Sequence, residues 1–240
     1  MSIITATSFG KVAVLMGGWA AERDISLISG KAVHQGLRNR GVDAHVVDVD
    51  RNVFTQLSDG QYDRAFVVLH GRGGEDGVIQ GALEILGLPY TGSGVLGSAL
   101  GMDKYRCKLL WQGMGLPTPA FAMIHQENDL ETAAEIGFPM MIKPAHEGSS
   151  IGMSKVDNPG QLHSAWQAAA RYDSAVLAEA WIEGSEYTVA IMGDQPLPLI
   201  KLETDNSFYD YQAKYESDET RYLLPCGLDV QQETDLQQLA

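Results

Sequence analysis

The stretch MMIKPAHEGSSIGMSKV, residues 140–156, decides how we interpret the second half of the chain. Apolar residues lead to Lys143 and a proline, and Gly-Ser-Ser-Ile-Gly (148–152) follows before a second strand-like segment. The pattern predicts two strands joined by a small loop beside a fixed cation. Backbone N–H groups of glycine and serine can surround an anion, so the loop is a candidate phosphate site. An ordinary hairpin is the alternative.

Composition narrows the class of protein. The 240 residues are 45% hydrophobic and 20% charged, which is typical of a globular chain of two domains or more. The net charge of −14 argues against nucleic acid or an anionic membrane as the main partner. Cys107 and Cys226 form no CxxC pair, and no apolar run approaches the roughly 18 residues of a membrane span. We therefore expect a cytoplasmic protein.

Strands and helices alternate in the first part of the chain. KVAVLMGG (11–18), AHVVDVD (44–50) and RAFVVLH (64–70) have the apolar pattern of strands, and helical periodicity follows in 22–41 and 78–87. Alternation of this kind favours a parallel sheet with helices on both faces. We place this domain at residues 1–92.

The pattern changes after Gly92. Helices are predicted at 102–115, 158–172 and 231–240, and strands at 116–124, 138–145, 151–156, 175–182, 186–193 and 197–203. Antiparallel strands packed on helices indicate an α+β unit. We place a central domain at 93–180 and a C-terminal one, incomplete, at 181–240.

The standard nucleotide-binding motifs do not identify a site in this sequence. There is no GxxxxGK[ST] phosphate loop. A GxGxxG pattern occurs at 92–97, but a proline interrupts the segment before it and no strand-ending acid follows at the required distance. A glycine-rich joint between two domains explains it better than a dinucleotide site.

Further candidates stand near the 140–156 stretch in the expected fold. Lys104 begins a helix after the glycine-rich joint and offers a second cation. Glu179 ends an apolar strand, and Trp181, Ile182 and Glu186 follow it. Such a group suits an adenine edge and ribose hydroxyls, although solvated acids at strand ends are equally common.

Five blocks together resemble the bacterial D-alanine–D-alanine ligase family of ATP-grasp enzymes. They are VLMGGWAAERDISLISG (14–30), the glycine-rich block 68–104, IKPAHEGSSIGMSKV (142–156), EYTVAI (186–191) and FYDYQAKYESDET (208–220), in the family's order. The resemblance implies an α/β protein with a Rossmann-like N-terminal domain followed by an ATP-grasp fold. It also implies synthesis of a peptidoglycan precursor in the cytoplasm by a homodimer.

The resemblance assigns roles by position. It implies that Lys104 and Lys143 hold ATP phosphates. The loop after Lys143 would act as a lid over these phosphates, with Glu147, Gly148 and Ser150 beside them. The adenosine pocket would contain Glu179, Trp181, Ile182 and Glu186. Glu22 would accept the ammonium of the first D-alanine, and Ser149 and Tyr215 would hydrogen-bond with Glu22. Lys214 would approach the transferring phosphoryl group, and His70 would lie beside the substrates.

Two departures from the family pattern matter. The family has Ser or Thr before AER, whereas Trp19-Ala20-Ala21 stands here. The chain also stops before the family segment that carries the ligands of two Mg²⁺ (or Mn²⁺) ions and the transition-state arginine, so no metal ligand is assigned.

Three alternatives to D-alanine–D-alanine ligation stay open. One is a D-alanine–D-lactate ligase, which the presence of Tyr215 disfavours. The others are another ATP-grasp carboxylate–amine ligase and an inactive nucleotide-binding fragment.

Overall fold

The computed structural model describes residues 5–204, 214 and 220–240. The chain divides into two compact units, residues 1–107 with 146–148, and residues 108–145 with 149–240. Each unit is described by itself. The domain boundaries predicted at 92/93 and 180/181 remain predictions.

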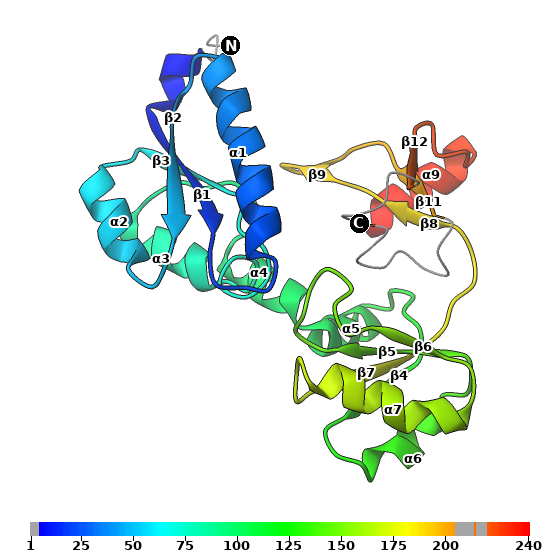
Figure 1. Ribbon diagram of the computed structural model, residues 1–240. Coiled ribbons are helices and arrows are strands. Elements are labelled where there is room, and N and C mark those ends of the chain that lie inside the picture. The colour runs from blue at the N-terminus through cyan, green and yellow to red at the C-terminus, as the bar shows by residue number, and fades with distance from the viewer. Residues whose placement is uncertain (1–4, 205–213, 215–219) are drawn as a thin grey trace. The chain divides into compact units, whose positions relative to one another are not determined.

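A three-stranded parallel sheet forms the centre of the first unit (Figure 1). Its order is β2-β1-β3, with β1 at Lys11–Gly17, β2 at Asp43–Val49 and β3 at Arg64–Val67. The helices of this unit are α1 (Arg23–Asn39), α2 (Val53–Gly60), α3 (Val78–Leu86) and α4 (Val95–Met102), with a short 3-10 turn at Ala6–Phe9. The predicted parallel sheet is confirmed. Strand β3 ends three residues before His70, which lies in the following loop.

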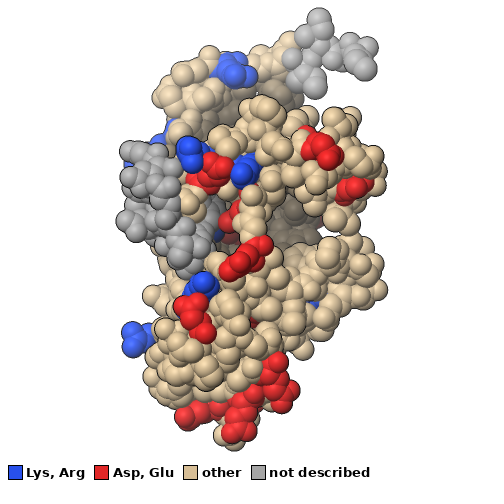
Figure 2. Space-filling view, turned by 90° about the vertical axis from the view of Figure 1, so that its right-hand side faces the viewer, with Lys and Arg blue, Asp and Glu red and all other residues tan. Residues whose placement is uncertain are grey.

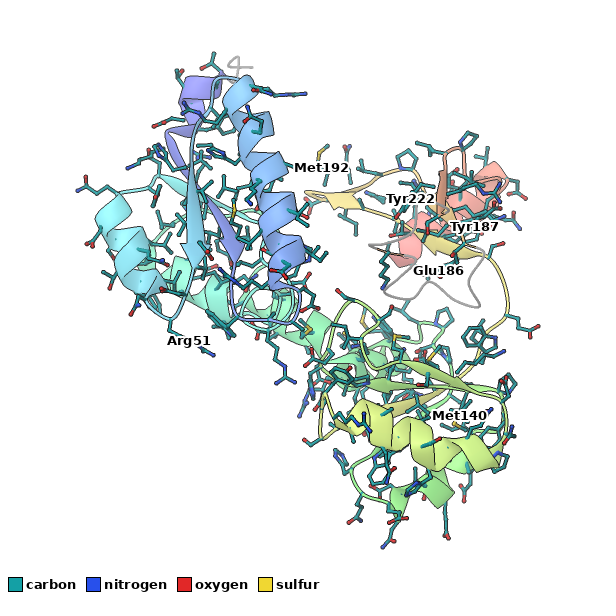
Figure 3. The ribbon with its side chains drawn as sticks, viewed as in Figure 1. Arg51, Met140, Glu186, Tyr187, Met192 and Tyr222 are labelled. Atoms are coloured by element: carbon teal, nitrogen blue, oxygen red, sulfur yellow. The ribbon has the colours of Figure 1, made fainter. Side chains whose placement is uncertain are left out.

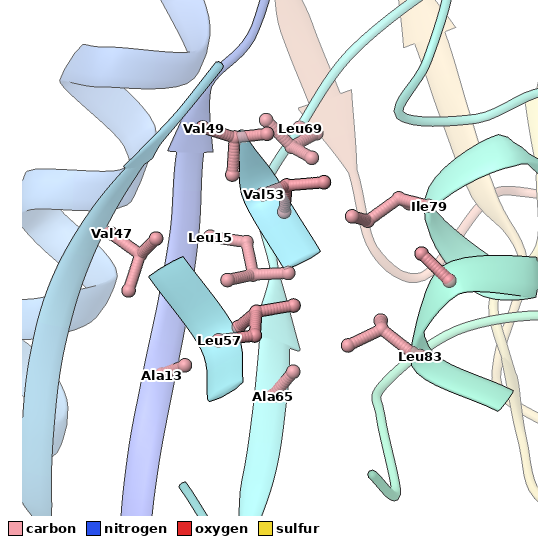
Figure 4. Packing of buried hydrophobic residues seen from close by; sticks show 11 residues of the cluster. Ala13, Leu15, Val47, Val49, Val53, Leu57, Ala65, Leu69, Ile79 and Leu83 are labelled. Atoms are coloured by element: carbon pink, nitrogen blue, oxygen red, sulfur yellow. The ribbon is translucent and has the colours of Figure 1, made fainter. Parts of the chain in front are cut away.

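Strand β1 is buried on both faces because helices cover each side of the sheet. Leu15 belongs to one apolar cluster with residues of α2 and α3, and Val14 belongs to another that contacts Leu27, Val33 and Leu37 of α1. Figure 4 shows side chains of α2 and α3 converging on Leu15. Alternating residues of β1 thus serve opposite faces, which explains its uninterrupted apolar sequence.

An antiparallel sheet of four strands organises the second unit. Its order is β4-β7-β5-β6, with β4 at Phe121–Ile124, β5 at Met140–Pro144, β6 at Ser154–Val156 and β7 at Val176–Ala180. Helices α6 (Asp129–Ala134) and α7 (Pro159–Ala170) supply apolar residues to a core that includes Met140. Asn158 caps α7 by accepting a hydrogen bond from the N–H of Gly160 at 3.1 Å. The two strands predicted around the 148–152 loop are therefore β5 and β6.

The last part of the second unit contains two small antiparallel sheets. One has the order β12-β11-β8, with β8 at Glu186–Thr188, β11 at Ile200–Glu203 and β12 at Arg221–Leu223. The other is the hairpin of β9 (Ile191–Met192) and β10 (Gln195–Pro196). Helix α9 (Val230–Leu239) begins at an Asp229 cap and confirms the predicted C-terminal helix. No helix among the described residues is both long and apolar enough to cross a membrane.

Candidate functional site

Glu22 is a buried carboxylate in the first unit. It stands at the start of α1, just after the loop that leaves β1, and its side chain is 1% exposed. Neither carboxylate oxygen has a hydrogen-bond partner among the described residues. An unpaired charge in such a place is costly, so Glu22 is a candidate site for a cation that the described residues do not supply.

Two glycines leave room around that carboxylate. A Cβ at Gly71, where φ is +60°, would stand 2.4 Å from Glu22 Oε2, and a Cβ at Gly148 would stand 3.2 Å from Oε1. Glu75 approaches from the same loop, because the N–H of Gly71 donates to its Oε2 at 2.7 Å. The backbone at Gly71 and Gly148 thus lies close against the Glu22 carboxylate, and Glu75 adds a second acid in the same loop.

Glu75 was not among the residues singled out from the sequence. The segment GRGGEDG could have identified Glu75 as a candidate, because it places an acid among four glycines directly after His70. His70 itself lies in this loop, and no described contact assigns its ring a role. The hydrogen bond expected from Ser149 to Glu22 remains a prediction. Tyr215 lies outside the described residues, and so does most of the block around Lys214.

Residues 146–148 are held by side chains of the first unit. The Lys104 ammonium donates to the carbonyl oxygen of Glu147, and Arg72 pairs with the Glu147 carboxylate at 2.7 Å. His146 Nε2 lies 3.2 Å from Asp103 Oδ2.

Asp103 remains ionised in this setting. Burial alone would raise the pKa of its carboxyl, but hydrogen bonds from the backbone and side chain of Arg106, together with His146, hold that pKa below its ordinary value. Lys104 and Arg72 thus place two basic side chains against Glu147, next to the tip of the loop that the sequence singled out first.

Lys143 lies on β5 in the second unit and contacts the neighbouring strand β7. Its Nζ donates to Glu179 Oε1 at 2.9 Å, and Lys108 Nζ lies 2.6 Å from Glu179 Oε2. Burial would raise the pKa of Glu179, but Lys143 and Lys108 outweigh burial and lower it. Both carboxylate oxygens of Glu179 thus contact lysines. A nucleotide that contacts this residue directly would therefore do so through its backbone.

The loop after Lys143 adopts an unusual backbone. Ser149 and Ser150 have φ values of 54° and 59°, and Gly152 has a φ of 69°. Residues other than glycine rarely hold this left-handed conformation, and their strain often marks a ligand site. N–H groups in such a run point to a common side, as an anion-binding loop requires.

The residues proposed for an adenosine pocket follow β7. The N–H of Trp181 donates to the Pro139 carbonyl at 3.1 Å, and Lys155 Nζ lies 4.8 Å from the centre of the Trp181 ring. Ile182 is 65% exposed, which leaves its side chain available to a ligand. Glu186 lies on β8 and is exposed (Figure 3). No contact among the described residues tests their assignment.

The surface around these residues is not uniformly basic. Figure 2 shows acidic side chains gathered over α6 of the second unit, whose first turn contains Asp129 and Glu131. The described residues contain no group of three or more His, Cys, Asp or Glu side chains that could hold a metal ion. Positive charge is therefore local, as a site for a small anion on an acidic protein requires.

Trp19 directly precedes Ala20, the position at which the family pattern has Ser or Thr. The Arg51 guanidinium lies 4.1 Å from the centre of its ring, and a Cβ at Gly73 would stand 2.2 Å from the indole. Together with Arg23 and Asp48, which pair at 2.7 Å, Trp19 lines a cavity of about 330 Å³. The departure from the pattern is thus accommodated by packing within the first unit.

Comparisons with known proteins agree on one family. Family models match residues 52–93, described as the D-ala D-ala ligase N-terminus, and residues 110–240, described as the D-ala D-ala ligase C-terminus. A D-alanine–D-alanine ligase of Alkalilimnicola ehrlichii is 59% identical over 241 residues, which cover 100% of this chain and 77% of that protein.

Solved structures agree with the sequence comparison. A D-alanine–D-alanine ligase from Bacillus anthracis has a TM-score of 0.83 and 29% identity, and the match covers 95% of this chain and 76% of that one. The same ligase complexed with ATP matches with a TM-score of 0.79 and 26% identity over 95% and 75% of the two chains. The expected architecture, a parallel-sheet domain followed by an ATP-grasp fold, is confirmed.

Proposed function

The chain belongs to the D-alanine–D-alanine ligase family, whose ATP-dependent reaction it catalyses, and we propose how its described residues divide that reaction. The carboxylate of one D-alanine attacks the γ-phosphorus of ATP, and ADP leaves. The amine of a second D-alanine then attacks the acyl phosphate, loses a proton and expels phosphate. A carboxylate is a poor acyl donor, and phosphorylation makes its oxygen a leaving group.

We propose that Glu22 binds the ammonium group of the first D-alanine. The single observation that supports this role is a carboxylate that is 1% exposed and has no hydrogen-bond partner among the described residues. An ammonium would neutralise the charge and supply hydrogen bonds that the described protein groups do not. Glu75 would add to the negative potential of the same pocket, and His70 would lie beside the bound substrate.

Lys143 and Lys104 are proposed to hold ATP phosphates. Phosphoryl transfer depends on positioning and charge stabilisation, which ammonium groups and backbone donors provide. The left-handed backbone at Ser149 and Ser150 and the contacts of Glu147 support a loop that covers the phosphates with Gly148 at its tip. Such a cover would protect the acyl phosphate from water.

The remaining roles rest on the family pattern. Trp181, Ile182 and Glu186 would line the adenosine pocket with the backbone of Glu179. Lys214 would approach the transferring phosphoryl group, and Ser149 and Tyr215 would bind Glu22 when the loop closes.

Mg²⁺, a homodimer and a cytoplasmic location also remain proposals. The described residues do not form a metal centre, so no step is assigned to the metal, whose ligands the family pattern places beyond residue 240.

The test of this proposal is ADP release by the purified protein with ATP, Mg²⁺ and D-alanine, with the intact mass measured on the same sample. Turnover that requires D-alanine, and that Glu22→Gln abolishes while ATP still binds, supports the assigned roles. Unchanged turnover in Glu22→Gln would refute the role of Glu22.

A further inference from the structure

Lys108 is a buried cation that the proposed reaction does not use. It lies on α5 (Lys104–Gly113), one helical turn after Lys104, and its side chain is 3% exposed. It is the one lysine or arginine classed as buried in the part of the chain that the structure describes. Burying a lysine is expensive, so its place calls for an explanation.

The contacts of Lys108 account for how its charge is tolerated. Its Nζ lies 2.6 Å from Glu179 Oε2, donates to Thr118 Oγ1 at 2.6 Å, and stands 5.0 Å from the centre of the Phe121 ring. Burial lowers the pKa of Lys108, and its hydrogen bond with Glu179 opposes that effect. The lysine therefore depends on one carboxylate above all other partners.

That carboxylate is shared with Lys143. Glu179 Oε1 accepts from Lys143 Nζ at 2.9 Å while Oε2 faces Lys108, so a single negative charge lies between two positive ones. The three side chains together carry one net positive charge. Without Lys108, Glu179 would neutralise Lys143 alone and draw its ammonium toward β7.

We propose that Lys108 is a positioning residue for ATP binding: by engaging Glu179, it leaves Lys143 with positive charge to offer the phosphates. The inference rests on the proposed phosphate role of Lys143. It differs from a purely structural role, in which Lys108 only fills space, because it predicts that ATP affinity follows the net charge of the three side chains.

The experiment compares ATP dissociation constants, measured by titration calorimetry, across variants of defined net charge. Lys108→Met sets the net charge to zero, Glu179→Gln raises it to two, and the double variant Lys108→Met/Glu179→Gln restores one. Attraction between an ammonium and a phosphate falls as that charge is neutralised, so Lys108→Met should weaken ATP binding by about tenfold. The double variant should bind ATP about as tightly as the unmodified protein, and Glu179→Gln at least as tightly.

Two further variants separate this inference from the function on which it rests. Lys143→Met should weaken ATP binding by about tenfold or more. If it does not, the proposed phosphate role of Lys143 fails. If it does and Lys108→Met still binds ATP normally, the role of Lys108 fails. Lys201→Met is the matched control, because Lys201 pairs with Glu203 at 2.9 Å in the same unit and should leave ATP affinity unchanged.

The design also covers a Lys108→Met protein that does not fold. The double variant has neither the buried carboxylate nor the buried ammonium, whereas Glu179→Gln leaves the Lys108 ammonium without its carboxylate; the two proteins differ only at residue 108. Tighter ATP binding by Glu179→Gln than by the double variant supports the inference. Equal binding, or a double variant that binds ATP more weakly than a folded Lys108→Met, overturns it.

Discussion

Gly148 lies against the buried carboxylate of Glu22, so that a Cβ at residue 148 would stand 3.2 Å from Glu22 Oε1. The absence of a side chain there keeps space beside a charge that has no protein partner among the described residues. The tip of the proposed phosphate-binding loop and the proposed ammonium site thereby both belong to the first unit.

Gly148→Ala should raise the KM for D-alanine by about tenfold, because an added methyl in a filled site costs on the order of 1–3 kcal/mol. The added Cβ would occupy part of the ammonium pocket. Steady-state kinetics with varied D-alanine at saturating ATP measures the effect. The matched control is Gly113→Ala, because a Cβ there meets nothing within 4 Å. An unchanged KM in Gly148→Ala would show that the pocket does not hold the substrate amine.

Glu22→Gln should stabilise the fold while it removes D-alanine binding. The amide has the shape of the carboxylate but no charge, so the cost of burying an unpaired anion disappears, and we expect a gain of about 1 kcal/mol in the free energy of unfolding. Urea unfolding measures stability, and D-alanine binding is followed by calorimetry. Asp24→Asn removes a carboxylate from the first turn of the same helix and should leave D-alanine binding unchanged. A destabilised Glu22→Gln protein would mean that the carboxylate has a partner in solution.

The pairing of Glu179 with two lysines should give part of the stability a specific pH dependence. Its pKa is lower in the folded protein than the ordinary value of 4.5, so the ionised form stabilises the fold above that value. This contribution falls as pH decreases through the lowered pKa. The difference in unfolding free energy between the unmodified protein and Glu179→Gln should therefore be constant from pH 7 to about 5 and shrink in more acidic solution. A difference that grows toward low pH would contradict the pairing.

The sequence predicted those features that follow from local pattern. The apolar run of β1 predicted a strand buried on both faces, and Lys143 at a strand end beside Gly-Ser-Ser-Ile-Gly predicted a cation next to a special loop. Both inferences needed only periodicity and the conformational preferences of glycine. They were confirmed because helices do cover both faces of the parallel sheet and because β5 and β6 do flank that loop.

The residues that the sequence analysis did not identify have environments that arise from tertiary packing. A lysine in an amphipathic helix is ordinarily solvated, and only the fold shows that Lys108 faces Glu179 across 71 positions of the chain. From the sequence alone, Glu75 looks like an ordinary acid in a loop. Only the structure shows that its carboxylate accepts a hydrogen bond from the N–H of Gly71, a residue that lies against Glu22. The burial of Glu22 was equally hidden, because it arises from glycines at 71 and 148, far from it in sequence.

Substrate choice should favour an amine over a hydroxyl as the second nucleophile. The family pattern associates transfer to D-lactate with loss of the tyrosine that stands here at Tyr215, a residue outside the described part of the chain. We expect ADP release with D-alanine alone and little further release when D-lactate is added. Product analysis by mass spectrometry distinguishes the dipeptide from the ester. Comparable amounts of both products would refute this choice.

The ion pair between Arg72 and Glu147 should be coupled to D-alanine binding. The pair measures 2.7 Å, and the Glu147 side chain is 11% exposed, so its charges are less screened than those of a surface pair. By holding Glu147, Arg72 keeps the adjacent Gly148 against the Glu22 pocket. Arg72→Ala and Glu147→Ala should each weaken D-alanine binding severalfold, and the double variant should be no worse than the poorer single variant. Additive losses in this double-mutant cycle would mean that the two residues act separately. Lys155 of β6 and Asp157, which follows that strand, provide the control pair, because they lie 3.3 Å apart and should show no coupling to D-alanine.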